Sequence, residues 1–366
     1  MKKIQQILTL ILTFGFLAVF SAWFLLSPDS DESQTERRML AKRPALSFSS
    51  VANGSFMNGF EKYMLDQFPL RNGFRTLKAV TAGKVFMQKD NNGLYSAGNH
   101  LSKLDFPTNL ASVDYAARRF RLVYDEYLKK SGAKTYLSVI PDKNTFIASQ
   151  NGYPDKDYEA LVKRLRSGFS QEEYIDISAL LSADDFYYTD SHWRQEKILK
   201  VAAEIAKKMG AKPIGECKTQ DTGVPFYGVY YGQSALPHAP EPLRYLDNAV
   251  IRDLKVYNAE IKSEIPVYDL KAAGGRDPYE MFLGGARSII TITNPNVVRE
   301  RRLVIFRDSF GSSIAPLFTA GYSEITLVDI RYISPSALSK LVDFSGVSDV
   351  LFLYSASVIN NSETIK

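Results

Sequence analysis

The sequence predicts an α/β fold with a parallel sheet, preceded by a single membrane-spanning helix. Near its start, the run from Ile4 to Leu26 carries no charged residue and is rich in Leu, Ile, Phe and Val. From residue 113 onward, segments of helical periodicity alternate with short runs of β-forming residues. Repeated β-α units of this kind form parallel sheets with helices on both faces. No glycine signature of a dinucleotide or phosphate loop accompanies them, and no internal repeat is evident.

Composition indicates a globular protein of one large or two modest domains. The chain has 366 residues, of which 45% are hydrophobic and 23% charged. Its net charge of +5 is spread thinly, without a basic run or an aromatic-interleaved stripe, so we expect no nucleic-acid partner.

The counts of cysteine and histidine exclude an intrachain disulfide and argue against a histidine-rich zinc site. Cys217 is the only cysteine, so no intrachain disulfide can form. The only histidines are His100, His192 and His238, and no cysteine cluster replaces them as ligands. A zinc site rich in histidine is therefore hard to assemble. We expect no metal and no cofactor.

The apolar run from Ile4 to Leu26 is long enough to cross a lipid bilayer. It lacks the small-x-small exit of a cleaved signal peptide, so we expect an uncleaved anchor, with cleavage after Ala22 as the alternative. Lys2 and Lys3 favour a cytoplasmic N-terminus, whereas Arg37, Arg38, Lys42 and Arg43 lie near the other end. Because a large domain after a single anchor is usually the translocated part, we expect the body on the extracytoplasmic side.

The sequence predicts three regions along the chain. Residues 1–28 form the anchor, residues 29–80 a stalk with a helical juxtamembrane segment, and residues 81–366 the α/β domain. An irregular, aromatic insertion is expected around 213–275. Residues 56–68 have helical spacing, and residues 84–95 resemble a hairpin with its turn at Asn91–Gly93.

Within the α/β domain, periodicity predicts the main elements. Expected helices are 113–131, 158–168, 194–209, 312–318 and 335–342, and expected strands are 134–140, 173–177, 288–293, 303–306, 324–329 and 350–354. Lys143 and Asn144 follow the first of these strands at its carboxyl end, where ligands of open α/β sheets bind.

A turn with the features of a nucleophile's position follows the strand at 303–306. The segment Arg307-Asp308-Ser309-Phe310-Gly311 leads from that strand into a helix. A serine there lies at the carboxyl edge of the sheet, next to free backbone N–H groups of the helix start. The alternative is that Asp308 or Ser309 only caps the helix.

A second segment supplies the partners that a serine nucleophile needs. Asp190 and His192 are two residues apart, which places their side chains on one face of an extended chain. The carboxylate can accept the Nδ1–H of the imidazole and leave Nε2 to take a proton from serine. Together with Ser309 they predict a catalytic triad, although a structural histidine is the alternative.

These residues resemble a known family. Asp190-Ser-His-Trp193, followed much later by Asp308-Ser-Phe310, is similar to the SGNH hydrolase-like proteins of the alginate O-acetyltransferase group, and to their DHHW branch in particular. The resemblance extends over most of the chain after the anchor. It includes Glu36–Leu40, Asp66–Arg71, Asp277–Gly285 and Val328–Tyr332. Ser191 stands where the branch has its first His, and Arg307 stands where SGNH proteins have Gly.

The resemblance implies a three-layer α/β/α fold of the SGNH type and a Ser-His-Asp acyl transfer. The expected reaction is O-acetylation of a cell-surface or secreted polysaccharide, with a membrane-bound O-acyltransferase partner that supplies acetyl. The body would lie outside the bacterial cell membrane, which residues 4–26 would cross. A polysaccharide acetylesterase and a non-catalytic glycan-binding or scaffold subunit are the alternatives.

Four further residues are candidates for the oxyanion site or the substrate-lining surface. Gly285 offers a backbone N–H as a second oxyanion donor, because paired glycines at 284 and 285 allow close backbone approach. Tyr279 belongs to the same segment, Arg307 precedes the Asp-Ser turn, and Ser355 follows the last strand.

Overall fold

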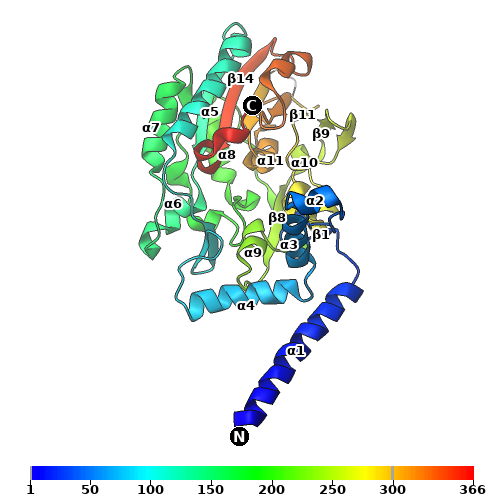
Figure 1. The fold of residues 1–366 in the computed structure, drawn as a ribbon. Helices are drawn as coiled ribbons and strands as arrows, with labels where there is room; N and C mark the ends of the chain where they lie inside the picture. The colour runs from blue at the N-terminus through cyan, green and yellow to red at the C-terminus, as the bar shows by residue number, and fades with distance from the viewer. Residues whose placement is uncertain (1, 298–300) are drawn as a thin grey trace. The chain divides into compact units, whose positions relative to one another are not determined.

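The computed structural model describes residues 2–297 and 301–366. The chain divides into two compact units by its contacts, residues 1–92 with 231–238 and residues 93–230 with 239–366. The second unit contains an eight-stranded sheet in the order β10-β9-β11-β13-β12-β14-β5-β6 (Figure 1). Its strands are β5 (Lys134–Ile140), β6 (Glu173–Tyr174), β9 (Lys255–Asn258), β10 (Ser263–Ile265), β11 (Ile289–Thr293), β12 (Arg302–Arg307), β13 (Glu324–Val328) and β14 (Val347–Ser355).

The sheet is mixed, with a parallel part that carries the predicted β-α units. β12 pairs in parallel with β13 and β14, and β14 and β6 both pair in parallel with β5. β11 joins antiparallel to β13, and β9 and β10 extend that edge by further antiparallel pairing. The expected parallel sheet is thus confirmed for five strands and extended by three antiparallel ones.

Helices cover both faces of this sheet, as predicted (Figure 1). The α-helices of the second unit are α5 (Leu110–Val123), α6 (Lys143–Ile147), α7 (Tyr158–Gly168), α8 (Leu199–Lys208), α10 (Ala249–Arg252), α11 (Phe310–Ile314) and α12 (Ala356–Asn360), and α9 (Val229–Ser234) spans the boundary between units. A π-helical turn, Tyr124–Leu128, continues α5. Short 3-10 helices include Ser149–Asn151, Ser178–Leu180, Ala183–Asp185, Gln195–Lys197, Ala272–Gly274, Pro278–Met281, Ala315–Phe318, Pro335–Lys340 and Ser362–Thr364.

Alternation along β12 divides the core into two layers. Leu303 and Ile305 pack in one apolar cluster with the buried face of α8. Val304 and Phe306 belong to the other cluster, with the buried faces of α5 and α7. Because successive strand residues point to opposite faces, this alternation identifies a three-layer α/β/α arrangement.

Most elements expected in this domain are present with small shifts of boundary. The strand 134–140 and the helix 158–168 have the predicted bounds. Two expectations are too long: the strand at 173–177 is reduced to Glu173–Tyr174, and the helix near 335–342 is a 3-10 helix, Pro335–Lys340. Pro335 starts that helix, and Gly346 with φ of 70° prepares the turn into β14.

The hairpin predicted over residues 84–95 is wrong in its first strand. Asn92 and Gly93 do turn with φ of 58° and 72°, but residues 84–90 form no strand. The hairpin lies one element later, between β3 (Leu94–Ala97) and β4 (His100–Lys103), with its turn at Gly98. A turn signal in sequence identifies the reversal but not which of two adjacent reversals joins paired strands.

The segment 213–275 is more regular than expected. It contains the antiparallel pair β7 (Lys218–Phe226) and β8 (Glu241–Asp247), the helices α9 and α10, and the sheet strands β9 and β10. Prolines at 225 and 242 lie opposite each other where the register of β7 and β8 shifts, which explains why the strand pattern is hard to recognise.

The N-terminal unit consists mainly of helices. They are α1 (Lys2–Leu26), α2 (Phe48–Ala52), α3 (Ser55–Gln67) and α4 (Arg71–Lys84), accompanied by the short pair β1 (Glu32–Ser33) and β2 (Arg38–Met39). Among the described residues α1 alone is long and apolar enough to cross a membrane, judged by length and composition.

Ion pairs join two of the segments that carry the family resemblance. Arg38 binds both carboxylate oxygens of Asp66, and the Arg71 guanidinium pairs with Glu36. Arg75 lies 3.3 Å from Glu36. The Arg38 guanidinium holds the pKa of Asp66 at about 2. Residues 36–40 and 66–71 therefore serve to fix the linker after α1 against the turn between α3 and α4.

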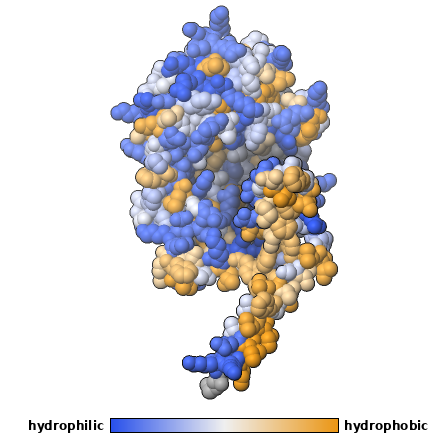
Figure 2. All heavy atoms as spheres, in the orientation of Figure 1, coloured by the Kyte–Doolittle hydropathy of each residue, from blue (hydrophilic) through white to orange (hydrophobic). Residues whose placement is uncertain are grey.

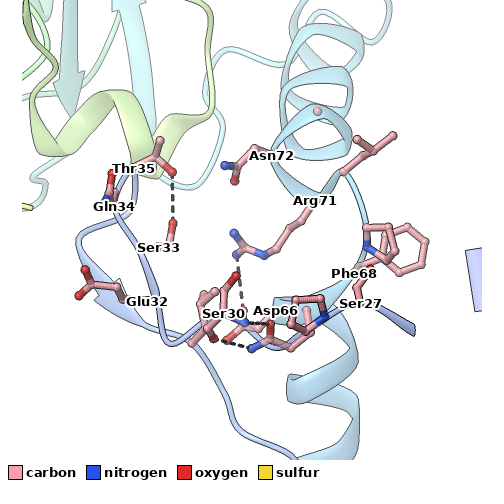
Figure 3. A pocket seen from close by; sticks show the side chains of 16 residues that line it. Ser27, Ser30, Glu32, Ser33, Gln34, Thr35, Asp66, Phe68, Arg71 and Asn72 are labelled. Atoms are coloured by element: carbon pink, nitrogen blue, oxygen red, sulfur yellow. Dashed lines mark hydrogen bonds and ion pairs between the residues drawn. The ribbon is translucent and has the colours of Figure 1, made fainter. Parts of the chain in front are cut away.

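A groove of about 600 Å³ lies where this linker passes the turn (Figure 3). Ser27 and Pro28, the first residues after α1, line it together with Asp66, Leu70 and Gly73. Ser30 donates its N–H to the side-chain oxygen of Gln67 at one side of the groove. The start of α4 thus lies beside the point where α1 ends.

Candidate functional site

The turn after β12 places Ser309 at the start of α11, as predicted. Asp308 has no exposed surface, and its two oxygens hold the turn: Oδ1 accepts the N–H of Phe310 at 3.0 Å and Oδ2 that of Ser355 at 2.8 Å. Asp308 therefore ties the turn to the carboxyl end of β14. The side chain of Ser309 makes no cap hydrogen bond to the helix, which leaves its hydroxyl available for another partner.

Ser309, His192 and Asp190 are joined by hydrogen bonds in series. Nε2 of His192 lies 2.7 Å from Oγ of Ser309, and Nδ1 lies 2.6 Å from Oδ1 of Asp190. Asp190 is fully buried, whereas the side chain of His192 is 14% exposed. The three side chains thus have the contacts of a serine–histidine–aspartate triad, with the reactive end near solvent.

The loop that carries Asp190 and His192 is a tight reversal. Phe186 and Trp193 form an antiparallel bridge at its base, and Tyr187 donates its N–H to the carbonyl of His192 at 3.0 Å. Oδ1 of Asp190 also accepts the backbone N–H of His192 at 3.1 Å. The side chains of Asp190 and His192 are therefore brought together by a turn and not, as predicted, by an extended strand.

Two buried charges of opposite sign hold this loop. The ammonium of Lys143, at the start of α6, donates to the carbonyls of Tyr187, Tyr188 and Asp190 at 2.8, 3.0 and 2.9 Å. Burial lowers the pKa of Lys143 to about 7, although the carboxylates of Asp190 and Glu241 favour its charged form.

Glu241, at the start of β8, accepts hydrogen bonds from backbone N–H groups of the same loop. Its oxygens accept the N–H groups of Tyr188 and Thr189, each at 2.9 Å, and the hydroxyl of Thr189 at 3.0 Å. Arg194 completes the arrangement by donating to Glu241 at 2.7 Å. The backbone groups of the loop are thereby satisfied by side chains from two separate elements, as buried polar groups must be.

Close backbone approach at Gly228 supports Asp190 from another side. A Cβ on Gly228 would lie 2.2 Å from the carbonyl oxygen of Thr189 and 2.4 Å from Cβ of Asp190, so only glycine fits. The next residue, Val229, donates its N–H to Oδ2 of Asp190 at 2.9 Å. The second carboxylate oxygen is therefore also bound.

Tyr279 lies flat against the imidazole ring of His192. The ring centroids are 3.8 Å apart with an angle of 13° between the planes, and Tyr279 is 3% exposed. Its hydroxyl donates to Oγ of Ser313 at 2.8 Å, and Nε1 of Trp193 donates to the same oxygen at 2.8 Å. Ser313 in turn donates to the carbonyl of Phe310 at 3.3 Å, so its hydroxyl uses all of its bonding capacity.

The structure does not place Arg307 on the lining of the site. Its side chain is fully buried, and its guanidinium donates to the carbonyls of Gly285, Arg287 and Asp308 at 3.2–3.3 Å. Its aliphatic part passes under α11, where a Cβ on Gly311 would lie 2.6 Å from Cβ of Arg307. The residue in place of the family's glycine therefore links loops beneath the turn.

The backbone N–H of Gly285 and the hydroxyl of Ser355 also form hydrogen bonds away from the site. The N–H of Gly285 donates to the carbonyl of Phe282 at 3.0 Å, so the expectation that it is an oxyanion donor is corrected. Ser355 is 2% exposed and its hydroxyl caps α12 by accepting the N–H of Val358. It reaches the site only through its backbone N–H, which donates to Asp308.

Several residues that build the site have no clear signal in sequence. Glu241 and Gly228 lie in the segment expected to be irregular, and Ser313 is one serine among several after the turn. Lys143 was recognisable only as a residue that follows a strand end. Among residues 2–297 and 301–366, no three His, Cys, Asp or Glu side chains form a group suited to a metal ion.

Comparison with solved structures identifies proteins of similar fold. A DHHW family protein from Eubacterium siraeum has a TM-score of 0.61 at 20% identity, covering 75% of this chain and 95% of its own. PatB1 from Bacillus cereus, in a structure with a sulfonyl adduct, has a TM-score of 0.58 at 15% identity, covering 73% of this chain and 95% of its own. The chain has the fold of these proteins. No protein-family model and no curated protein sequence matches it.

The shared fold confirms what the resemblance in sequence implied about architecture. The DHHW family protein has the branch name that Asp190–Trp193 suggested, and its similarity extends over three quarters of this chain. At these levels of identity the comparison concerns the fold. The roles of the site residues are therefore argued from the geometry described above.

Replacing Ser313 with alanine should destabilise the protein. The change removes the acceptor of two buried donors, the hydroxyl of Tyr279 and Nε1 of Trp193, and each orphaned donor costs about 1–3 kcal/mol. Urea unfolding of the Ser313→Ala variant should show the loss as a lower midpoint. The exposed Ser149→Ala is the matched control, and equal midpoints for the two variants would contradict this account of Ser313.

Replacing Lys143 with methionine should loosen the loop at 187–192. The methionine has a similar length but cannot donate to the carbonyls of Tyr187, Tyr188 and Asp190, of which that of Tyr188 keeps the N–H of Leu101, so local opening becomes more frequent. Amide hydrogen exchange in this loop should then be faster, while exchange in β12 reports whether the fold is intact. The exposed Lys163→Met serves as control. Unchanged loop exchange in Lys143→Met would show that other contacts suffice to hold it.

Proposed function

We propose that the protein is an acyl-transfer enzyme that uses Ser309, His192 and Asp190 as a catalytic triad. The observation that carries this proposal is the series of hydrogen bonds from Ser309 through His192 to Asp190, at 2.7 and 2.6 Å. Contacts of this length, with the serine half-buried at the end of a parallel strand, match what nucleophilic acyl transfer needs.

In the first half-reaction Ser309 becomes acylated. Its Oγ attacks the carbonyl carbon of an acyl donor while its proton passes to Nε2 of His192. Asp190 accepts the Nδ1–H and stabilises the imidazolium, and general-base assistance of this kind contributes about 10²–10⁴-fold. The tetrahedral intermediate then releases the donor's leaving group, which takes the proton from His192.

In the second half-reaction a hydroxyl compound removes the acyl group. His192, neutral again, takes the proton of the incoming hydroxyl as its oxygen attacks the acyl-serine carbonyl. Collapse of the second intermediate releases the new ester and returns the proton to Oγ of Ser309. If water takes the place of the hydroxyl compound, the same steps amount to ester hydrolysis.

The backbone N–H of Ser309 is the oxyanion donor that we assign. The neighbouring amides of Phe310 and Gly311 already donate to the side chain and carbonyl of Asp308. An amide at the nucleophile itself lies close to the oxygen of the tetrahedral intermediate, which is where such donors act.

For the substrate we propose an acetyl group and an extracytoplasmic polysaccharide acceptor. The support is the resemblance to the alginate O-acetyltransferase group, the fold shared with PatB1, and a structure of PatB1 that carries a sulfonyl adduct. A membrane-bound O-acyltransferase partner would supply acetyl. α1 would anchor the protein in the cell membrane with its second unit on the extracytoplasmic side.

A sulfonyl fluoride such as phenylmethanesulfonyl fluoride should label Ser309. Oγ attacks sulfur, fluoride leaves, and His192 takes the proton, so labelling needs the triad but no acyl donor. Intact mass and peptide mapping should place one sulfonyl group on Ser309. Asp190→Asn should label at least roughly 100-fold more slowly because His192 loses its orienting carboxylate. Ser309→Ala should remain unlabelled.

The matched control for this experiment is Ser149→Ala, which should label at the wild-type rate because Ser149 is an exposed serine in another part of the unit. Labelling of folded Ser309→Ala at the wild-type rate would locate the reactive group elsewhere and reject the triad.

Transfer and hydrolysis differ in what they do with a second hydroxyl compound. With a chromogenic acetyl ester as donor, addition of an unacetylated polysaccharide should raise the rate of donor consumption and produce acetylated polysaccharide. Both effects should be lost in Ser309→Ala. Donor consumption that is independent of the polysaccharide, with acetate as the only product, would assign the protein to the acetylesterases.

A further inference from the structure

α4 and the residues at its two ends present a row of apolar side chains on the outside of the N-terminal unit. Leu70, Phe74, Leu77 and Val85 follow one another at intervals of four, three and eight residues, which keeps them on one side of a helix. Phe86 and Met87, which follow the end of α4, are exposed as well, and the exposed fractions of the six side chains range from 38% to 77%.

The other side of α4 is the one that packs within its own unit. Ala79 and Ala82 are buried there, and Arg75 donates to the carbonyl of Gly232 at 2.8 Å. The helix therefore buries two alanines and exposes its large apolar residues. In a helix surrounded by water this distribution is reversed, because the large apolar residues gain most from burial.

The charges along this segment are of one sign. No acidic residue occurs from Gln67 to Lys89, whereas Lys78 and Lys84 are exposed along the sides of the apolar row. A helix with an apolar face, flanking lysines and no carboxylate has the composition of helices that lie at the surface of an anionic membrane. Lysine side chains reach from such a position toward the lipid headgroups.

Contacts with α1 place the same segment beside the apolar helix. The ring of Phe20 is 5.5 Å from that of Phe68 and 5.7 Å from that of Phe74. Phe20 is six residues from the end of α1, which corresponds to about 9 Å along its axis. The start of α4 therefore lies beside the part of α1 that precedes its last turn. Figure 2 shows hydrophobic residues along α1 and on the helices that follow it.

We propose that α4, with Leu70 and residues 85–87, lies along the surface of a phospholipid bilayer as an interfacial amphipathic helix. The proposal rests on the assignment of α1 as a membrane anchor. It adds a second contact of different character, parallel to the bilayer, which restrains rotation of the N-terminal unit about the axis of α1.

Spin labels on single cysteines of the full-length protein test this arrangement. Cys217→Ser removes the only cysteine, after which Leu77→Cys carries the label on the apolar row and Phe86→Cys carries it just beyond the end of α4. Asn72→Cys is the matched control, since Asn72 is exposed on the same helix but is not part of the apolar row. Leu12→Cys reports on α1. The protein is placed in nanodiscs of phosphatidylcholine and phosphatidylglycerol, and accessibility to oxygen and to a water-soluble nickel chelate is measured.

Labels at positions 77 and 86 should favour oxygen over nickel and lie about 5–10 Å into the bilayer, whereas the label at 72 should favour nickel. Equal, water-like accessibility at 72, 77 and 86 would overturn the proposal. If the Leu12 label still reports lipid in that case, α1 remains an anchor, and if it does not, the anchor assignment fails as well. Dipolar broadening between labels at 77 would assign the apolar row to a second copy of the chain and would also overturn it.

Discussion

The burial of the Asp190 carboxylate is the constraint on which the rest of the site depends. A carboxylate without exposed surface is tolerated only when hydrogen bonds replace the water it has lost. Here both oxygens are bound, Oδ1 by the ring and backbone of His192 and Oδ2 by the N–H of Val229. These partners reach Asp190 only if the loop keeps a fixed shape. Lys143 holds that shape by donating to the loop carbonyls, and Glu241 by accepting from the loop amides. The hydrogen bonds to Asp190 in turn orient the ring of His192 toward Ser309.

The elements of the sheet were predictable because each depends on its own residues. β5 and α7 have unambiguous periodicity and begin and end where the sequence indicates. The antiparallel edge was not predictable, because pairing of β11 with β13 and β9 is decided between segments far apart in the chain. The same holds for β7 and β8, whose opposed prolines interrupt the alternation that identifies strands.

At the site, the sequence identified the groups that resemble known chemistry and not those that support them. Asp190, His192 and Ser309 were recognisable because a two-residue spacing and a position after a strand end are local features of the sequence. Their contact joins segments 117 residues apart, and Asp190 and His192 meet through a turn and not through the extended chain that was expected. Glu241 comes from a distant strand, and Gly228 is required because a Cβ there would overlap the carbonyl of Thr189 and Cβ of Asp190. Arg307 and Gly285 were misassigned since exposure and backbone bonding cannot be read from residue type.

The packing of Arg307 beneath α11 has a consequence for the divergence of related chains. Cβ, Cγ and Cδ of Arg307 all lie within 3.1 Å of where a Cβ on residue 311 would be. An arginine before the Asp-Ser turn is thus compatible only with glycine four residues later, whereas a glycine at the first position removes this restriction. The dependence runs in one direction, because glycine at 311 fits any residue at 307, whereas a side chain at 307 requires glycine at 311. Chains that carry a side chain before the Asp-Ser turn are therefore expected to keep glycine four residues later.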